Sequence, residues 1–147
     1  MARLYIVAHA PLASALRDVA QHVFPDCGGS VDALDVQPGA SLEAVEAALR
    51  AGLAAPGEVL ILADVFGATP CNAALAAADG VRVRVVAGVN VPMLWRTLCY
   101  QDKPLDDLVN RAVAGASQGV MHVAVPRRQN QAAPALTHDQ VHHHHQQ

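Results

Sequence analysis

The sequence predicts an α/β fold, in which helices cover both faces of a mostly parallel sheet with strand order 2-1-3-4. Short apolar runs alternate along the chain with segments of helical periodicity. Two of the runs, LYIVA and VLILA, carry no charge, which is typical of strands that are buried on both faces. A residue suited to a helix start, such as proline, threonine or asparagine, follows shortly after several of the runs.

The first half of the chain alternates twice between strand and helix. A strand over 3–8 leads into a helix over 11–24, because apolar residues recur there every three or four positions and Pro11 suits a first helical turn. Residues 30–36 alternate enough to form the second strand. Ser41 is the expected N-cap of the next helix, whose apolar face consists of Leu42, Val45, Leu49 and Leu53.

The second half repeats this alternation and then places two helices in succession. The strand over 58–63 is followed by a helix that Thr69 can cap, with Pro70 at its first position. The strand over 81–87 alternates more strongly, which favours an outer position in the sheet. The remaining predicted elements are a helix over 91–101 with Asn90 as N-cap, a helix over 105–116 and a last strand over 120–125.

Composition narrows the class of protein. The 147 residues suggest one domain, 52% of them are hydrophobic, and the formal net charge of −3 gives no basic surface for nucleic acid. No apolar run approaches the length of a membrane span, and Arg3 leads straight into the first strand without a signal-peptide pattern. The three cysteines, Cys27, Cys71 and Cys99, have no metal-ligand spacing. We therefore expect reduced thiols, a cytoplasmic location and no insertion into the membrane.

The composition shifts at Pro126. We expect residues 1–125 to form the folded domain and residues 126–147 to be a disordered tail, because glutamine, alanine, proline and histidine replace any core pattern there. The run His142–His145 could bind metal ions. A low-complexity tail or a trimmed purification tag is the favoured interpretation of this run.

Two polar residues follow the two buried strands. His9 ends the first and Asp64 ends the third. With strand order 2-1-3-4 these strands are neighbours, and the chain reverses direction between them, so both side chains face one crevice at the switch point. A carboxylate can hold one ring nitrogen of a histidine and leave the other as a free nucleophile.

The folded part carries no Walker P-loop, no GxGxxG and no GxSxG motif. It also has no acidic cluster suited to magnesium and no histidine–cysteine cluster, so no metal or cofactor is expected. What remains is one histidine, one carboxylate and several helix N-termini, which attract anions. This set suits a phosphoryl group held on His9.

Three stretches resemble signatures of the IIA component of the mannose-class sugar phosphotransferase system. LYIVAHAPLAS looks like the family's first strand with its phosphorylated histidine, LILADVFGATPCNAA resembles its second signature, and VVAGVNVPMLWRTL its third. The resemblance covers about residues 3–125 and implies a phosphotransferase that serves sugar transport. It implies that His9 is phosphorylated, that Asp64 orients it, that Gly67, Ala68 and Thr69 hold the phosphoryl oxygens, and that Asn90 shapes the rim.

The resemblance also implies partners. The histidine-containing phosphocarrier protein would supply the phosphoryl group, a separate IIB component would receive it, and a homodimer would exchange the final strand between subunits. Two positions depart from the family pattern, because Ala10-Pro11 follows the histidine in place of glycine and Ala68 replaces the second glycine of a pair. Both changes narrow the backbone freedom near the phosphate.

Three other functions remain open from the sequence. The phosphorylated state could serve only as a regulatory signal that other proteins read. A receiver-like module would instead be phosphorylated on Asp64, although the acidic pair that such modules carry after strand one is replaced here by Ala8-His9. A module that binds a small anion would use His9 merely as a contact.

Overall fold

The computed structural model describes residues 1–27 and 30–127. Within them one parallel sheet has the order β2-β1-β3-β4, as the sequence predicts. Five helices accompany the strands. The strands are β1 (Arg3–His9), β2 (Val31–Val36), β3 (Val59–Ala63) and β4 (Val83–Ala87), and the helices are α1 (Leu12–Val23), α2 (Leu42–Gly52), α3 (Thr69–Ala77), α4 (Val91–Cys99) and α5 (Leu105–Gln118).

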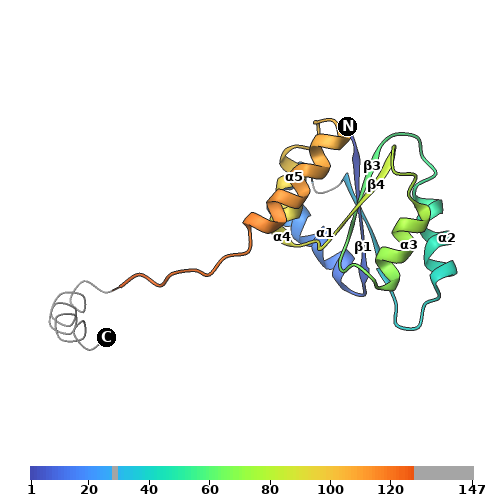
Figure 1. The fold of residues 1–147 in the computed structure, drawn as a ribbon, viewed down its shortest axis with the longest axis horizontal. Helices are drawn as coiled ribbons and strands as arrows, with labels where there is room; N and C mark the ends of the chain where they lie inside the picture. Colours follow the sequence, from blue (N-terminus) through green and yellow to red (C-terminus); the bar gives the residue numbers. More distant parts are fainter. Residues whose placement is uncertain (28–29, 128–147) are drawn as a thin grey trace, which may run out of the picture.

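The helices form two layers with the sheet between them (Figure 1). Alternate residues of β1 point to opposite faces, so Leu4 and Ile6 pack toward α1, α4 and α5, whereas Tyr5 and Val7 pack toward α2 and α3. All five residues of β3 are buried, which agrees with its uncharged sequence. β4 is less buried than β3 and is an edge strand, as its alternating pattern indicates.

The α4–α5 contact depends on two glycines of α5. A Cβ added at Gly115 would lie 2.7 Å from the Arg96 Cβ, and one added at Gly119 would lie 2.3 Å from the Pro92 Cβ. Because Gly115 and Gly119 are one turn apart, as are Pro92 and Arg96, the two helices approach closely along one stripe. This packing fixes the start of α4 against the end of α5.

The predicted last strand does not form within the single chain. Residues 120–127 have no regular secondary structure and are exposed, and they extend away from the domain beyond α5 (Figure 1). An extended segment becomes a strand only when a sheet edge pairs with it, and none of the strands in residues 1–27 and 30–127 pairs with this segment. Exchange of this segment in a dimer stays a prediction. Residues 128–147, most of the predicted tail, lie outside the described residues, as does the run His142–His145.

Candidate functional site

His9 and Asp64 meet at the carboxyl end of the sheet. β1 and β3 are neighbours with Val7 opposite Ala63, so the two strands deliver their next residues to the same crevice. His9 Nδ1 lies 2.7 Å from Asp64 Oδ2, and the His9 backbone N–H donates to the same oxygen at 3.0 Å. The switch-point position predicted from the sequence is therefore the place where the two side chains are found.

The hydrogen bonds to Asp64 decide the state of the ring. An ionised carboxylate can only accept hydrogen bonds, so His9 Nδ1 carries the proton and donates it. The His9 side chain is 54% exposed and the Asp64 side chain only 11%. Within the described residues nothing hydrogen-bonds to His9 Nε2, so in the neutral ring this nitrogen keeps its lone pair and faces outward.

The Asp64 carboxylate is held ionised by its neighbours. Burial raises the pKa of Asp64. This effect is outweighed by three hydrogen bonds, which come from the His9 backbone, the His9 ring and the Val65 backbone, and by the charge of His9, all of which lower the pKa. The Val65 N–H donates to Oδ1 at 2.8 Å. The pKa of Asp64 consequently lies below its ordinary value, and the carboxylate stays negative at neutral pH beside the histidine.

The N-terminus of α3 adjoins this pair. Gly67 has a φ of +95°, a region that favours glycine, and Ala68 is the N-cap with no side-chain hydrogen bond. The prediction that Thr69 caps this helix is wrong, because Thr69 is the first helical residue and Pro70 the second. Among the described residues we find no acceptor for the backbone N–H groups of Ala68 and Thr69, so both can bind an anion.

Ala68 fits its place without strain. Its φ of −104° and ψ of 168° are ordinary extended values, and no non-glycine residue among those described has a positive φ. The replacement of a glycine by Ala68 therefore removes backbone freedom that this conformation does not need.

The Ala10–Pro11 peptide is cis, and Pro11 precedes α1 as its N-cap instead of lying in its first turn.

The other helix N-termini near the crevice are already occupied. Asn90 caps α4 as predicted, since its Oδ1 accepts the Met93 N–H at 2.9 Å, and its Nδ2 donates to the Ala116 carbonyl at 3.3 Å. Asn90 therefore joins α4 to α5 at the edge of the site. Ser41 caps α2 by accepting the Ala44 N–H.

Sequence reasoning missed Asp35, which occupies the N-terminus of α1. Asp35 is the last residue but one of β2, and it accepts the Ser14 N–H at 3.0 Å and the Ser14 hydroxyl at 2.5 Å. The hydroxyl bond is the main cause of a pKa of Asp35 below its ordinary value. The available signal was Pro11, whose side chain cannot accept a hydrogen bond, so α1 needed an acceptor from elsewhere. With α1, α2 and α4 capped by side chains, α3 is the uncapped helix beside His9.

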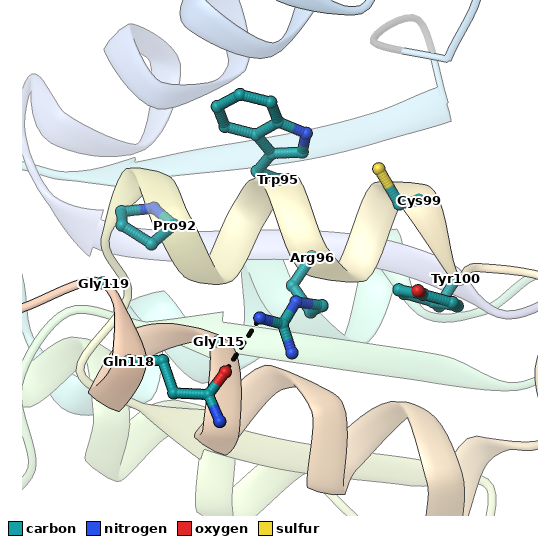
Figure 2. A pocket seen from close by; sticks show the side chains of 8 residues that line it. All are labelled: Pro92, Trp95, Arg96, Cys99, Tyr100, Gly115, Gln118 and Gly119. Atoms are coloured by element: carbon teal, nitrogen blue, oxygen red, sulfur yellow. Dashed lines mark hydrogen bonds between the residues drawn. The ribbon is translucent and has the colours of Figure 1, made fainter.

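A groove in the described part of the chain is separate from the histidine–aspartate pair. This groove is open, has a volume of about 390 Å³ and lies between α4 and α5. Figure 2 shows it with Arg96 donating to Gln118 at 3.0 Å. Its lining offers no histidine–carboxylate pair. In the described ranges no group of three histidine, cysteine or carboxylate side chains could hold a metal ion, and no helix is long and apolar enough to cross a membrane.

The fold is that of a parallel α/β domain, and its switch point holds a histidine ring whose Nδ1 is bonded to a carboxylate. The family model for the IIA component of the fructose phosphotransferase system matches residues 3–113. The chain therefore belongs to this family of sugar phosphotransferase IIA components, as the three sequence signatures indicate.

Named relatives agree with this assignment. The chain is 43% identical over 63 residues to the fructose-specific EIIA component of Bacillus subtilis strain 168, and 37% identical over 109 residues to the mannose-specific EIIAB component of Escherichia coli K12. These matches cover 42% and 69% of this chain but 43% and 34% of the relatives, so the chain spans less than half the length of either protein.

Solved structures show the same fold. The mannose/sorbose-specific IIA subunit from Enterococcus faecalis has a TM-score of 0.79 at 24% identity, with 86% of this chain and 98% of that chain covered. An EIIA component from Streptococcus agalactiae has a TM-score of 0.76 at 24% identity, with 83% and 97% covered.

Proposed function

We propose that the chain is a cytoplasmic phosphocarrier, which accepts a phosphoryl group on His9 from the histidine-containing phosphocarrier protein and passes it to a separate IIB component. One observation carries this proposal. The Nδ1 of His9 is held by Asp64 at 2.7 Å, on a ring that is about half exposed, which leaves Nε2 as a nucleophile. Family membership supports the same function.

The geometry suggests how the transfer proceeds. The Nε2 lone pair of His9 attacks the phosphorus of the donor's phosphohistidine, and a new N–P bond forms as the donor's N–P bond breaks. The electron pair of the broken bond returns to the donor ring, which becomes a neutral imidazole if its other nitrogen is protonated. The His9 ring gains the positive charge, and the adjacent Asp64 carboxylate stabilises that charge.

The free N–H groups at the start of α3 provide the phosphate site in this proposal. Ala68 and Thr69 contribute backbone N–H groups, the Thr69 hydroxyl adds a further donor, and Gly67 shapes the turn. Burial raises the pKa of the neighbouring Cys71 thiol, and the Gly67 backbone opposes this effect in part. Asn90 contributes by fixing the rim.

The hydrogen bonds that Asp64 accepts argue against the receiver-like alternative, in which Asp64 itself would be phosphorylated. Both of its carboxylate oxygens accept hydrogen bonds, and its side chain is 11% exposed. A nucleophilic carboxylate needs a free oxygen directed toward the phosphorus. A role limited to regulation would use the same phosphorylated His9, and it differs only in which protein responds.

We also propose that the chain forms a homodimer through residues 120–125. The segment exposes four large apolar side chains to solvent, and β2 and β4 are the free edges of the sheet. Exposed apolar segments with unpaired backbone tend to be covered by pairing with an edge. The four side chains are Val120, Met121, Val123 and Val125.

The carrier proposal is tested by intact mass. The protein is incubated with phosphoenolpyruvate, its kinase and the histidine-containing phosphocarrier protein, and the expected result is the gain of one phosphoryl group. His9→Ala should gain none, while His22→Ala, which changes an exposed histidine of α1, should gain one. Full phosphorylation of His9→Ala would refute the proposal.

A further inference from the structure

The N-terminus of α1 lies beside His9. Only Ala10 and Pro11 separate His9 from this helix, and the Ala10 N–H donates to the Val36 carbonyl of β2 at 2.9 Å. His9 itself lies opposite Val36 in the parallel register of β1 and β2. The end of β2 therefore fixes the turn that carries His9 into α1, and two helix N-termini, those of α1 and α3, adjoin the histidine.

Asp35 closes the N-terminus of α1 with a negative charge. Its two carboxylate oxygens accept the N–H and the hydroxyl of Ser14. The hydroxyl bond is the main cause that lowers the pKa of Asp35, and the Ala13 backbone and the charge of Arg17 act in the same direction. The carboxylate is consequently ionised at neutral pH and offsets the positive end of the helix dipole.

Asp35 is also near the position of a phosphoryl group on His9. It lies opposite Ala8 in the strand register, one residue before the pair of His9 and Val36. Adjacent strands are about 4.8 Å apart and rise about 3.3 Å per residue, so the Cα atoms of Asp35 and His9 lie roughly 6 Å apart. A carboxylate and a phosphoryl group at this end of the sheet repel each other, and salt weakens the repulsion. Asp64 differs, because it bonds to the ring and stabilises the positive charge that the ring gains.

We propose that Asp35 is a positioning residue for phosphoryl transfer, whose charge keeps the N-terminus of α1 from holding the phosphoryl group and leaves α3 as the anion site. This inference rests on the proposed function, in which the N–P bond at His9 Nε2 forms as the donor's N–P bond breaks, and in which the reverse step is equally open. Because the repulsion acts on the phosphorylated state, Asp35 raises the free energy of that state and favours passing the group on.

The test measures the equilibrium of transfer. The phosphorylated histidine-containing phosphocarrier protein is purified away from phosphoenolpyruvate and kinase and mixed with an equal amount of the chain, and intact mass gives both phosphorylated fractions. Asp35→Asn keeps the shape of the side chain and removes its charge. The equilibrium constant should therefore rise about three- to tenfold toward the phosphorylated chain at about 50 mM salt, and less than about twofold at about 500 mM salt. Loss of a merely structural contact would not favour the phosphorylated chain in a salt-dependent way.

Two variants are matched controls. Asp32→Asn removes the same charge from the same strand, but Asp32 lies near the other end of β2 and pairs with Arg3 at 3.3 Å. Ser14→Ala removes the hydroxyl bond and leaves the charge of Asp35 in place. Both equilibrium constants should stay within about twofold of the wild-type value.

Each outcome has one meaning. An equilibrium constant for Asp35→Asn that is unchanged or lower would overturn the inference and leave the carrier function standing. An equal rise in Ser14→Ala, or a rise that persists at high salt, would also overturn it, because the geometry of the cap would then matter instead of its charge. A wild-type chain that gains no phosphoryl group would refute the carrier function, and this inference with it.

Discussion

The His9 residue is held at two points by one oxygen of Asp64. Its backbone N–H and its ring Nδ1 both donate to Oδ2, while Oδ1 accepts the Val65 N–H. The ring therefore cannot rotate to present Nδ1 outward without losing a charge-assisted hydrogen bond. This arrangement accounts for a fixed tautomer in a crevice that is open to solvent.

The substitution Asp64→Asn separates the charge of this residue from its shape. An asparagine that keeps its oxygen toward His9 retains the tautomer but loses the negative charge, and its NH2 group, a donor, cannot accept the hydrogen bond of the Val65 N–H. We expect phosphoryl gain to slow on the order of 10²–10³-fold, the scale of one electrostatic partner. The measurement is the rate of mass increase with the protein donor, and Asp102→Asn on the exposed surface is the control. An unchanged rate for Asp64→Asn would show that the two residues are not coupled.

The sequence could predict the meeting of His9 and Asp64 because two uncharged apolar runs identify adjacent buried strands. It could not predict Asp35 as the cap of α1. That contact joins residues 21 positions apart and depends on how α1 is set against β2. The N-cap of α3 was misplaced by one residue because threonine is a common cap, whereas the backbone of Gly67 and Ala68 decides where the helix begins.

At the scale of elements, the loop between β3 and α3 determines where an anion can bind. Its glycine has a left-handed conformation and its alanine an ordinary one. The N-terminus of α3 has no side-chain cap, in contrast to α1, α2 and α4, in which the N–H of the third residue donates to Asp35, Ser41 and Asn90 respectively. One helix dipole is thus left to act on a group carried by His9.

Single substitutions of Gly67 and Ala68 test whether the loop between β3 and α3 determines where an anion binds. Gly67→Ala forces a side chain into a φ of +95°, so we expect a loss of roughly 1–2 kcal/mol in unfolding free energy and slower phosphoryl gain. Ala68→Gly leaves the backbone conformation accessible, so its transfer rate should stay within about twofold of the wild type. Urea unfolding and the transfer rate are measured together. A strong effect of Ala68→Gly alone would mean that the loop conformation has been misjudged.

At the scale of the whole molecule, the chain ends its folded part with an exposed apolar segment. The short apolar run in residues 120–125 predicts a strand, but the described part of one chain leaves this segment without a sheet edge to pair with. The strand was predicted from local pattern alone, but a strand also requires a neighbour. We therefore expect residues 120–125 to form a strand only beside the sheet edge of a second copy of the chain.

Two deletions distinguish the segment from the tail. Removing residues 128–147 should leave the oligomeric state and the thermal midpoint unchanged, because the sequence there lacks a core pattern. Removing residues 120–147 should convert a dimer to monomers or aggregates. Light scattering with size exclusion measures both. A dimer that persists without residues 120–147 would rule out the segment as the link.

The central claim is that Asp64 holds Nδ1 so that the phosphoryl group forms on Nε2 of His9. Phosphorus–nitrogen NMR of the phosphorylated protein, prepared with ¹⁵N-labelled histidine, measures this directly. We expect one phosphorus signal coupled to Nε2 of His9, lost in acid and stable to hydroxylamine. A phosphoryl group on Nδ1, or one on Asp64 that hydroxylamine removes, would contradict it.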